Sequence, residues 1–172
     1  MMKYFKTIVI PLSMYFMLIG LSVLSSDNEL LSKFFTYISF GLLVMSLVLG
    51  IYFNIIAKKT RVYDSKEMLL SNMIIKIVEI PGYLYVFFVG MLGTLFMQFA
   101  IAVWILCFLF DAICIFLSGL YATACIRKTY YENKITKREA ITFSVLSYIF
   151  VVDVVVAILL YFRVKGEKNY EI

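Results

Sequence analysis

Two aspartates, Asp111 and Asp153, are the residues of this 172-residue chain with the clearest potential for chemistry, because each interrupts a hydrophobic run. A carboxylate at the centre of a bilayer costs about 2.5 kcal/mol or more. Each acid therefore requires a proton, a cation, a hydrogen-bond donor within the chain, or a basic residue on another protein. We predict that Asp111 and Asp153 form a candidate intramembrane polar site.

The spacing of the two acids predicts that they lie at similar depth. Asp111 precedes Arg127 by 16 residues, and Asp153 follows Arg138 by 15 residues. If each run is one helix and both helices meet at the loop between these arginines, the rise per residue places both acids at matching distances from the loop. The acids could then share a proton or a cation, or each could fix helix packing through a hydrogen bond.

A second polar stripe consists of Asn72, Lys76 and Glu79, which share one face of a helix at positions i, i+4 and i+7. Lys76 and Glu79 are close enough on a helix to form an ion pair. Lys76 lies only about a third of the way along its predicted helix, so we expect its reach to the aspartates to be strained. Pairing with Glu79, or extension of the ammonium toward the lipid headgroups, is the preferred interpretation.

Composition argues against most catalytic classes. The chain has no histidine, which removes the usual haem and zinc ligand and the most frequent general base. Cys107, Cys114 and Cys125 are too far apart on a helix for a disulfide. No nucleophile with an adjacent base, phosphate-binding loop or metal cluster is recognisable. We therefore expect no enzyme activity, no cofactor, no metal and, because the basic residues are scattered over short loops, no nucleic-acid partner.

The hydrophobicity of the chain predicts a membrane protein. Hydrophobic residues make up 63% of the sequence, charged residues make up 16%, and the mean hydropathy is +0.96. A water-soluble domain could not carry such a surface. We predict an all-α, integral membrane helical bundle that forms one domain over residues 1–172.

Five membrane spans are predicted from the uncharged runs, at about residues 7–25, 34–57, 68–92, 99–126 and 141–162. The first run also resembles a secretory signal peptide, but its length and the runs that follow favour an uncleaved span. The 50 residues from Ile77 to Ile126 are too long for one span, and the turn is expected between Gly93 and Gln98.

The third span has two interpretations. Residues 68–80 could form an amphipathic helix in the membrane interface, which gives four spans plus that helix. Alternatively, one helix runs from about Met68 to Leu92, with a kink near Pro81 and its polar stripe turned into the bundle. We favour the second interpretation.

Charge counting favours a cytoplasmic N-terminus, with eleven Lys and Arg residues inside and four outside. The basic tail after the fifth run opposes this assignment, because five spans place it outside. With four spans the basic tail would lie inside, but the basic loop at residues 127–138 would then lie outside. We retain five spans and a multi-pass protein of the bacterial cytoplasmic (inner) membrane.

Several stretches carry a resemblance to a known group. They are Leu47–Lys59 (LVLGIYFNIIAKK), Ile77–Tyr83 (IVEIPGY), Phe110–Leu120 (FDAICIFLSGL) and Val152–Tyr161 (VDVVVAILLY). Together they resemble a family of small uncharacterised multi-span membrane proteins of low-GC Gram-positive bacteria. The resemblance implies a bacterial inner-membrane location and implies no particular activity.

These patterns lead to two functional hypotheses. The first is a non-enzymatic accessory or interaction subunit whose intramembrane acids set helix or partner contacts. The second is a small proton- or cation-coupled transporter or channel that uses Asp111 and Asp153. The expected partners are the lipid bilayer and either another membrane protein or a second copy of the chain.

Overall fold

The structure of the chain, a computed structural model, describes residues 8–23, 29–58, 64–95 and 100–166. Within these ranges the chain is helical and contains no strand. The helices are α2 (Val9–Val23), α3 (Glu29–Ile56), α4 (Ser65–Gly93), α5 (Ala100–Tyr131), α6 (Lys137–Leu146) and α7 (Val152–Gly166).

Three of these helices are long and apolar enough to cross a membrane. They contain the segments Lys33–Ile56, Ser65–Gly93 and Ala100–Tyr131. Helix α2 is apolar but shorter, with 15 residues. The prediction of an all-α membrane helical bundle is thus confirmed, and the chain is an integral membrane protein by the length and composition of its helices.

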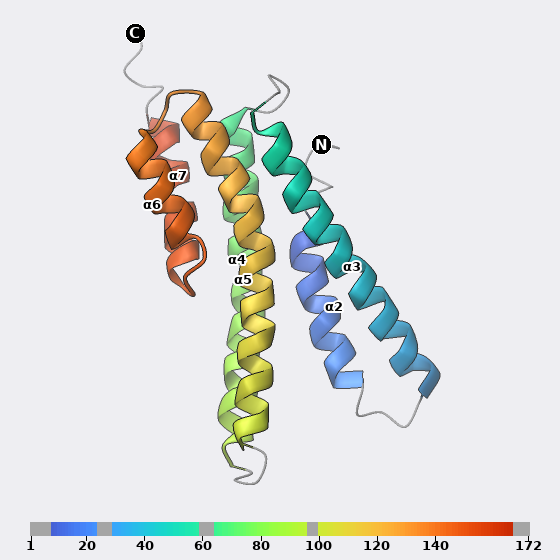
Figure 1. Cartoon of the computed structure of the whole chain (residues 1–172). Helices are drawn as coiled ribbons and strands as arrows, with labels where there is room; N and C mark the ends of the chain where they lie inside the picture. Colours follow the sequence, from blue (N-terminus) through green and yellow to red (C-terminus); the bar gives the residue numbers. More distant parts are fainter. Residues whose placement is uncertain (1–7, 24–28, 59–63, 96–99, 167–172) are drawn as a thin grey trace.

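The helices form two long antiparallel pairs with a short hairpin beside them (Figure 1). Helix α2 packs along α3, α4 packs along α5, and α3 joins the pairs through α5. Helices α6 and α7 lie beside the half of the α4–α5 pair that contains the end of α5 (Figure 1). The main buried cluster lies in this same half, where Phe53 of α3, Leu69 of α4, Tyr121 of α5 and Leu160 of α7 meet.

Helix α4 is continuous across Pro81, which settles the third run in favour of a single helix. The Asp64 carboxylate caps the helix by accepting from the Lys66 N–H. The stripe of Asn72, Lys76 and Glu79 is turned into the bundle, with exposed fractions of 3%, 0% and 1%. The interfacial-helix interpretation is therefore wrong, because the polar face lies against protein and not along a membrane surface.

The turn between the third and fourth runs lies where the glycines predicted it. Helix α4 ends at Gly93, and α5 begins at Ala100. A Cβ atom on Gly93 would lie 2.5 Å from Cγ1 of Val103, so glycine permits the close approach of the two helices. Gln98, the predicted far edge of the turn, lies outside the described residues.

The prediction of one span over residues 141–162 is wrong. Helix α6 ends at Leu146, a turn follows, and α7 begins at Val152 and runs back antiparallel to α6 (Figure 1). Helices of 10 and 15 residues measure about 15 and 22 Å, short of the roughly 30 Å of hydrocarbon in a bilayer. The two helices form a hairpin whose outer ends lie at the same end of the bundle.

The turn of this hairpin contains neither glycine nor proline. Ser147 ends α6, with its hydroxyl donating to the Phe143 carbonyl at 2.8 Å. Val151 has a φ of 67°, a left-handed conformation that is unfavourable for a β-branched residue. Gly119 of α5 lets the turn approach, because a Cβ atom there would lie 2.6 Å from Cε1 of Tyr148. Tertiary contacts with α5 thus stabilise a turn that local sequence signals do not indicate.

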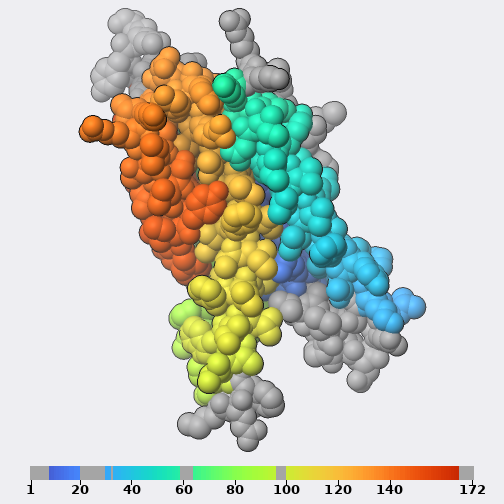
Figure 2. Space-filling view, in the orientation of Figure 1, coloured from blue at the N-terminus to red at the C-terminus, as the bar shows by residue number. Residues whose placement is uncertain are grey.

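The hairpin stops partway along α5. In the space-filling view, side chains of the first half of α5 are uncovered on this face beyond the hairpin (Figure 2). The exposed side chains there include Trp104, Ile105, Phe108 and Leu109, which form an apolar surface suited to lipid or to another transmembrane helix.

Candidate functional site

A buried ion cluster joins three helices. The Lys76 ammonium of α4 lies 2.5 Å from Oδ2 of Asp153 on α7 and donates to Oγ of Ser118 on α5 at 2.6 Å. Oε2 of Glu79, one turn further along α4, lies 3.6 Å from the same ammonium. The exposed fractions of Lys76 and Ser118 are both 0%, and those of Glu79 and Asp153 are both 1%. The cluster is therefore shielded from lipid and from water by the protein itself.

Each member of the cluster is oriented by further hydrogen bonds. The Ser118 hydroxyl donates to the Cys114 carbonyl at 2.9 Å, so its oxygen is directed to accept from Lys76. The second oxygen of Asp153 accepts from the Val154 N–H at 2.8 Å. Asp153 also lies in the first turn of α7, where the helix dipole stabilises a carboxylate. The Tyr83 hydroxyl donates to Glu79 Oε2 at 3.2 Å.

The cluster contains two carboxyl groups for one ammonium. A single ammonium can neutralise one carboxylate, so the second carboxyl group is accommodated by hydrogen bonds or by a proton. Removal of one partner of such a buried pair leaves an uncompensated charge, which costs about 3 to 5 kcal/mol. The cluster thus fixes α7, and with it the hairpin, against α4 and α5.

The expectation that the reach of Lys76 to the aspartates would be strained is wrong for Asp153. That expectation assumed one helix over residues 141–162. Because the chain reverses after Leu146, Asp153 lies on the returning arm, within reach of Lys76.

The two aspartates have different surroundings. Asp111 precedes Ser118 by seven residues, which is about 10 Å along α5. Within the described part of the chain, no hydrogen bond or ion pair joins Asp111 to Asp153.

Asp111 lies in a crevice beneath the turn of the hairpin. Its Oδ1 atom is buried and has no hydrogen-bond partner among the described residues. The crevice has a volume of about 600 Å³. Its walls are Phe108, Ala112, Ile115 and Phe116 of α5, and Tyr148, Ile149 and Phe150 of the turn. An unpartnered carboxyl oxygen among apolar side chains is costly, so the position of Asp111 requires an explanation.

The residues of the polar stripe of α4 also differ in whether they have partners. Lys76 and Glu79 belong to the cluster, whereas Oδ1 of the buried Asn72 has no hydrogen-bond partner in the described ranges. The hydroxyl groups of Ser118 and Tyr83 complete the cluster, and neither was predicted from the sequence as a member of it. Tyr83 follows Glu79 by four residues on α4, a helical spacing that could have indicated their hydrogen bond.

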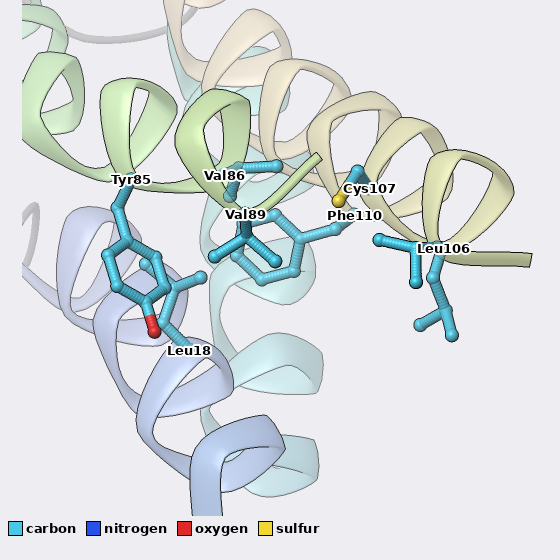
Figure 3. Close-up of a pocket in the computed structure, with 8 residues that line it drawn as sticks. Leu18, Tyr85, Val86, Val89, Leu106, Cys107 and Phe110 are labelled. Atoms are coloured by element: carbon cyan, nitrogen blue, oxygen red, sulfur yellow. The ribbon is translucent and has the colours of Figure 1, made fainter. Parts of the chain in front are cut away.

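A second, apolar cavity of about 340 Å³ opens between α2, α4 and α5. In Figure 3, Leu18 of α2 approaches Tyr85 and Val89 of α4, while Cys107 and Phe110 come from α5. The side chains that line this cavity carry no charged group. The cavity can hold an apolar group such as an acyl chain, but it offers no chemistry.

A polar network closes the end of the bundle where α5 ends and α4 begins. Lys134 lies 2.6 Å from Oε2 of Glu132 and 3.4 Å from Oδ1 of Asp64. Partial burial raises the pKa of the Glu132 carboxyl, but hydrogen bonds from Lys134 and Ser65 hold the pKa below its ordinary value overall. Partial burial lowers the pKa of Lys134, yet the bond to Glu132 and the nearby Asp64 raise that pKa overall.

The start of α6 is held to the end of α7. Thr136 and Glu139 form a capping box, and Glu139 pairs with Arg163 at 2.7 Å. The Thr136 N–H and the Arg163 guanidinium hold the pKa of the Glu139 carboxyl below its ordinary value. The two outer ends of the hairpin, the start of α6 and the end of α7, are therefore fixed to each other.

Fold and site together define an integral membrane helical protein with a buried ion cluster and, within the described ranges, a buried carboxyl oxygen of Asp111 that has no hydrogen-bond partner. Comparison of the chain with protein-family models, with curated proteins and with solved structures finds no match. The function is therefore inferred from the geometry of the site.

Proposed function

We propose that the protein is a non-enzymatic subunit of a membrane assembly that binds a transmembrane helix of a partner protein at Asp111. The partner helix carries a basic residue at the depth of this carboxyl group. The supporting observation is that Asp111 Oδ1 is buried without a hydrogen-bond partner among the described residues, in a crevice with apolar walls. An ion pair between spans is a strong way to specify membrane assembly, because an unpaired charge in lipid is so unfavourable.

The contrast between the two acids supports separate roles. Both carboxylate oxygens of Asp153 have a partner within the chain, Lys76 for one and the Val154 N–H for the other. This carboxylate therefore serves folding. Among the described residues Asp111 has no comparable partner, so we infer that its role lies outside the monomer.

The partner is a different protein and not a second copy of the chain. A second copy would have to supply a cation at membrane depth. Among the described residues, the lysine that lies within a membrane-spanning segment away from the helix ends is Lys76, and it is engaged with Asp153 and Ser118. A partner span with its own Lys or Arg supplies the missing charge.

The distribution of basic residues supports a cytoplasmic location for the end of the bundle where α4 begins. Nine of the eleven Lys and Arg side chains in the described ranges lie at that end, Lys33 lies at the other, and Lys76 lies between them. The nine are Lys58, Lys66, Arg127, Lys128, Lys134, Lys137, Arg138, Arg163 and Lys165. The N-terminal end of helix α2 points toward this end of the bundle (Figure 1), so the positive-inside rule favours a cytoplasmic N-terminus in a bacterial cytoplasmic membrane.

The experiment uses a designed helix as a probe. The protein is reconstituted in liposomes with a fluorescent Leu/Ala transmembrane peptide that carries one central lysine, or with the same peptide carrying leucine there. We expect energy transfer to show at least about fivefold stronger association with the lysine peptide, as one ion pair of about 1 kcal/mol would give. Asp111→Asn abolishes the preference, whereas Glu67→Gln, which removes a carboxylate outside the crevice, preserves it. Equal association of both peptides contradicts the proposal.

A second candidate function is a proton- or cation-coupled pathway. The observation in its favour is the excess of carboxyl groups in the cluster, where Glu79 and Asp153 share one ammonium. Such a cluster can bind one exchangeable proton or cation. Liposomes that contain the protein and a pH-sensitive dye test this alternative, since a pathway gives acid-dependent flux that Glu79→Gln abolishes. Absence of flux under proton, sodium and potassium gradients removes it.

A further inference from the structure

A crevice between α3 and α5 lies at the same end of the bundle as the basic residues, and its chemistry differs from that of the Asp111 crevice. Its volume is about 380 Å³. The linings are Ile51, Asn54, Ile55, Lys58, Leu120 and Arg127. Two cations thus lie beside an apolar groove near the ends of α3 and α5.

Neither cation is neutralised by the part of the chain that the structure describes. The side chains of Lys58 and Arg127 form no hydrogen bond or ion pair with those residues. Their basic neighbours do, since Lys128 and Lys134 pair with Glu132, and Arg163 pairs with Glu139. The carboxylates of Glu132 and Glu139 are therefore engaged elsewhere, and the crevice retains two positive charges among the described residues.

The groove between the two helices is held in a fixed shape. The Asn54 carboxamide donates to the carbonyls of Gly50 at 3.0 Å and Leu120 at 2.7 Å, which ties α3 to α5. Gly50 allows this approach, because a Cβ atom there would lie 3.0 Å from Cβ of Leu120. Ile51 and Ile55 remain 45% and 65% exposed on the wall of the groove. The site is thus preorganised, with a polar head and an apolar extension.

We propose that this crevice binds an anionic phospholipid. The Lys58 ammonium and the Arg127 guanidinium donate to the phosphate and headgroup oxygens, and one acyl chain lies along Ile51, Ile55 and Leu120. Two unneutralised cations favour an anionic over a zwitterionic lipid, since a choline headgroup would bring a third positive charge. The apolar groove favours a lipid over a free phosphate, because a free phosphate would leave these side chains without a contact.

This inference does not depend on the proposed partner at Asp111, because the two crevices share no residue. It also does not depend on the orientation of the protein in the membrane. It requires only that the ends of α3 and α5 lie near the headgroups.

The test compares lipid retention by native mass spectrometry of the full chain in detergent, with phosphatidylglycerol or phosphatidylcholine added. The wild type should retain phosphatidylglycerol preferentially. Lys58→Gln/Arg127→Gln should lower its affinity by about 10- to 30-fold, as expected for two lost headgroup contacts. The matched control, Lys137→Gln/Arg138→Gln, removes the same charge from the start of α6 and should retain the lipid. Circular dichroism checks that both variants are folded.

Three outcomes overturn the proposal. Equal loss of lipid in the crevice variant and in the control indicates attraction by net charge alone. Equal retention of phosphatidylglycerol and phosphatidylcholine removes the role of the two cations. Displacement of the lipid by inorganic phosphate at matched concentration, together with unchanged lipid binding in Ile55→Asn, assigns the site to a free anion.

Discussion

The Lys76 ammonium lies 2.5 Å from Oδ2 of Asp153, although the two residues are 77 positions apart in the chain. This ion pair connects the middle of α4 to the first turn of α7. The hairpin of α6 and α7 is too short to cross a bilayer, so its place beside α5 is determined by contacts such as this one.

Removal of one partner of this pair should strongly destabilise the protein. In Asp153→Asn the Lys76 ammonium remains buried without its counter-charge, and we expect a loss of about 3 to 5 kcal/mol in the free energy of unfolding. Thermal denaturation in detergent micelles, followed by circular dichroism, measures the effect.

The triple variant Lys76→Met/Glu79→Gln/Asp153→Leu is the control for that experiment, because it leaves no charged group in the cluster. Replacement of buried charges by neutral side chains of similar size is often neutral or stabilising. We expect it to recover most of the stability lost by the single variant. A triple variant as unstable as the single one would show that the unpaired charge is not the cause.

The turn of the hairpin should be sensitive to volume at Gly119. Because a Cβ atom there would lie 2.6 Å from the Tyr148 ring, Gly119→Ala should displace the turn and cost about 1 to 3 kcal/mol. Gly41→Ala is the matched control, since no atom lies within 4 Å of a Cβ atom at that position. It should be neutral or slightly stabilising, because alanine has the higher helix propensity. Equal effects of the two substitutions would contradict the contact between Gly119 and Tyr148.

Sequence patterns predicted the parts of this fold that depend on local chemistry. The favoured interpretation of the stripe of Asn72, Lys76 and Glu79 was a helix face turned into the bundle, and the structure buries this face. Gly93 predicted the turn into α5. Both follow from helical spacing and from the conformational needs of glycine.

The break between α6 and α7 could not be predicted from local sequence patterns. Residues 147–151 contain no glycine or proline, and the surrounding hydropathy is that of a span. Asp153 interrupted that run, and an acid in the first turn of a helix is a start signal that could have been weighed. Its contact with Lys76 spans 77 positions, so no local spacing encodes it.

Single-cysteine labelling distinguishes a hairpin from a fifth span. Lys137 begins α6, and Lys165 lies in the last turn of α7. In a background without native cysteines, Lys137→Cys and Lys165→Cys should both react with a membrane-impermeant maleimide from the same side of sealed vesicles. Lys33→Cys should react from the opposite side. Labelling of the first two positions from opposite sides would restore the fifth span.

The network around Lys134 should make stability depend on pH at both extremes. The pKa of Glu132 is held below its ordinary value of 4.5, so its contribution is present above that value and is lost as the pH falls through the folded pKa. The pKa of Lys134 is raised above 10.5, so its contribution is present below that value and is lost as the pH rises through the folded pKa. Because both side chains remain partly exposed to solvent, each effect should stay below about 1 kcal/mol. Glu132→Gln should flatten the acid limb of the stability curve measured in micelles, while Glu67→Gln should leave it unchanged.

Asp111 should respond to substitution with the opposite sign from Asp153. If the Asp111 carboxyl group completes its hydrogen bonds only with a partner helix, then in the isolated protein it is a cost. Asp111→Leu should then raise the free energy of unfolding by about 1 to 2 kcal/mol, because it removes a partly buried polar group that lacks a partner. The same variant should lose the preference for the lysine peptide. If the variant is more stable but no longer binds the peptide, Asp111 contributes to function at a cost to the stability of the fold. A loss of stability in Asp111→Leu comparable to that in Asp153→Leu would show instead that Asp111 has an internal partner, and the site would belong to the fold alone.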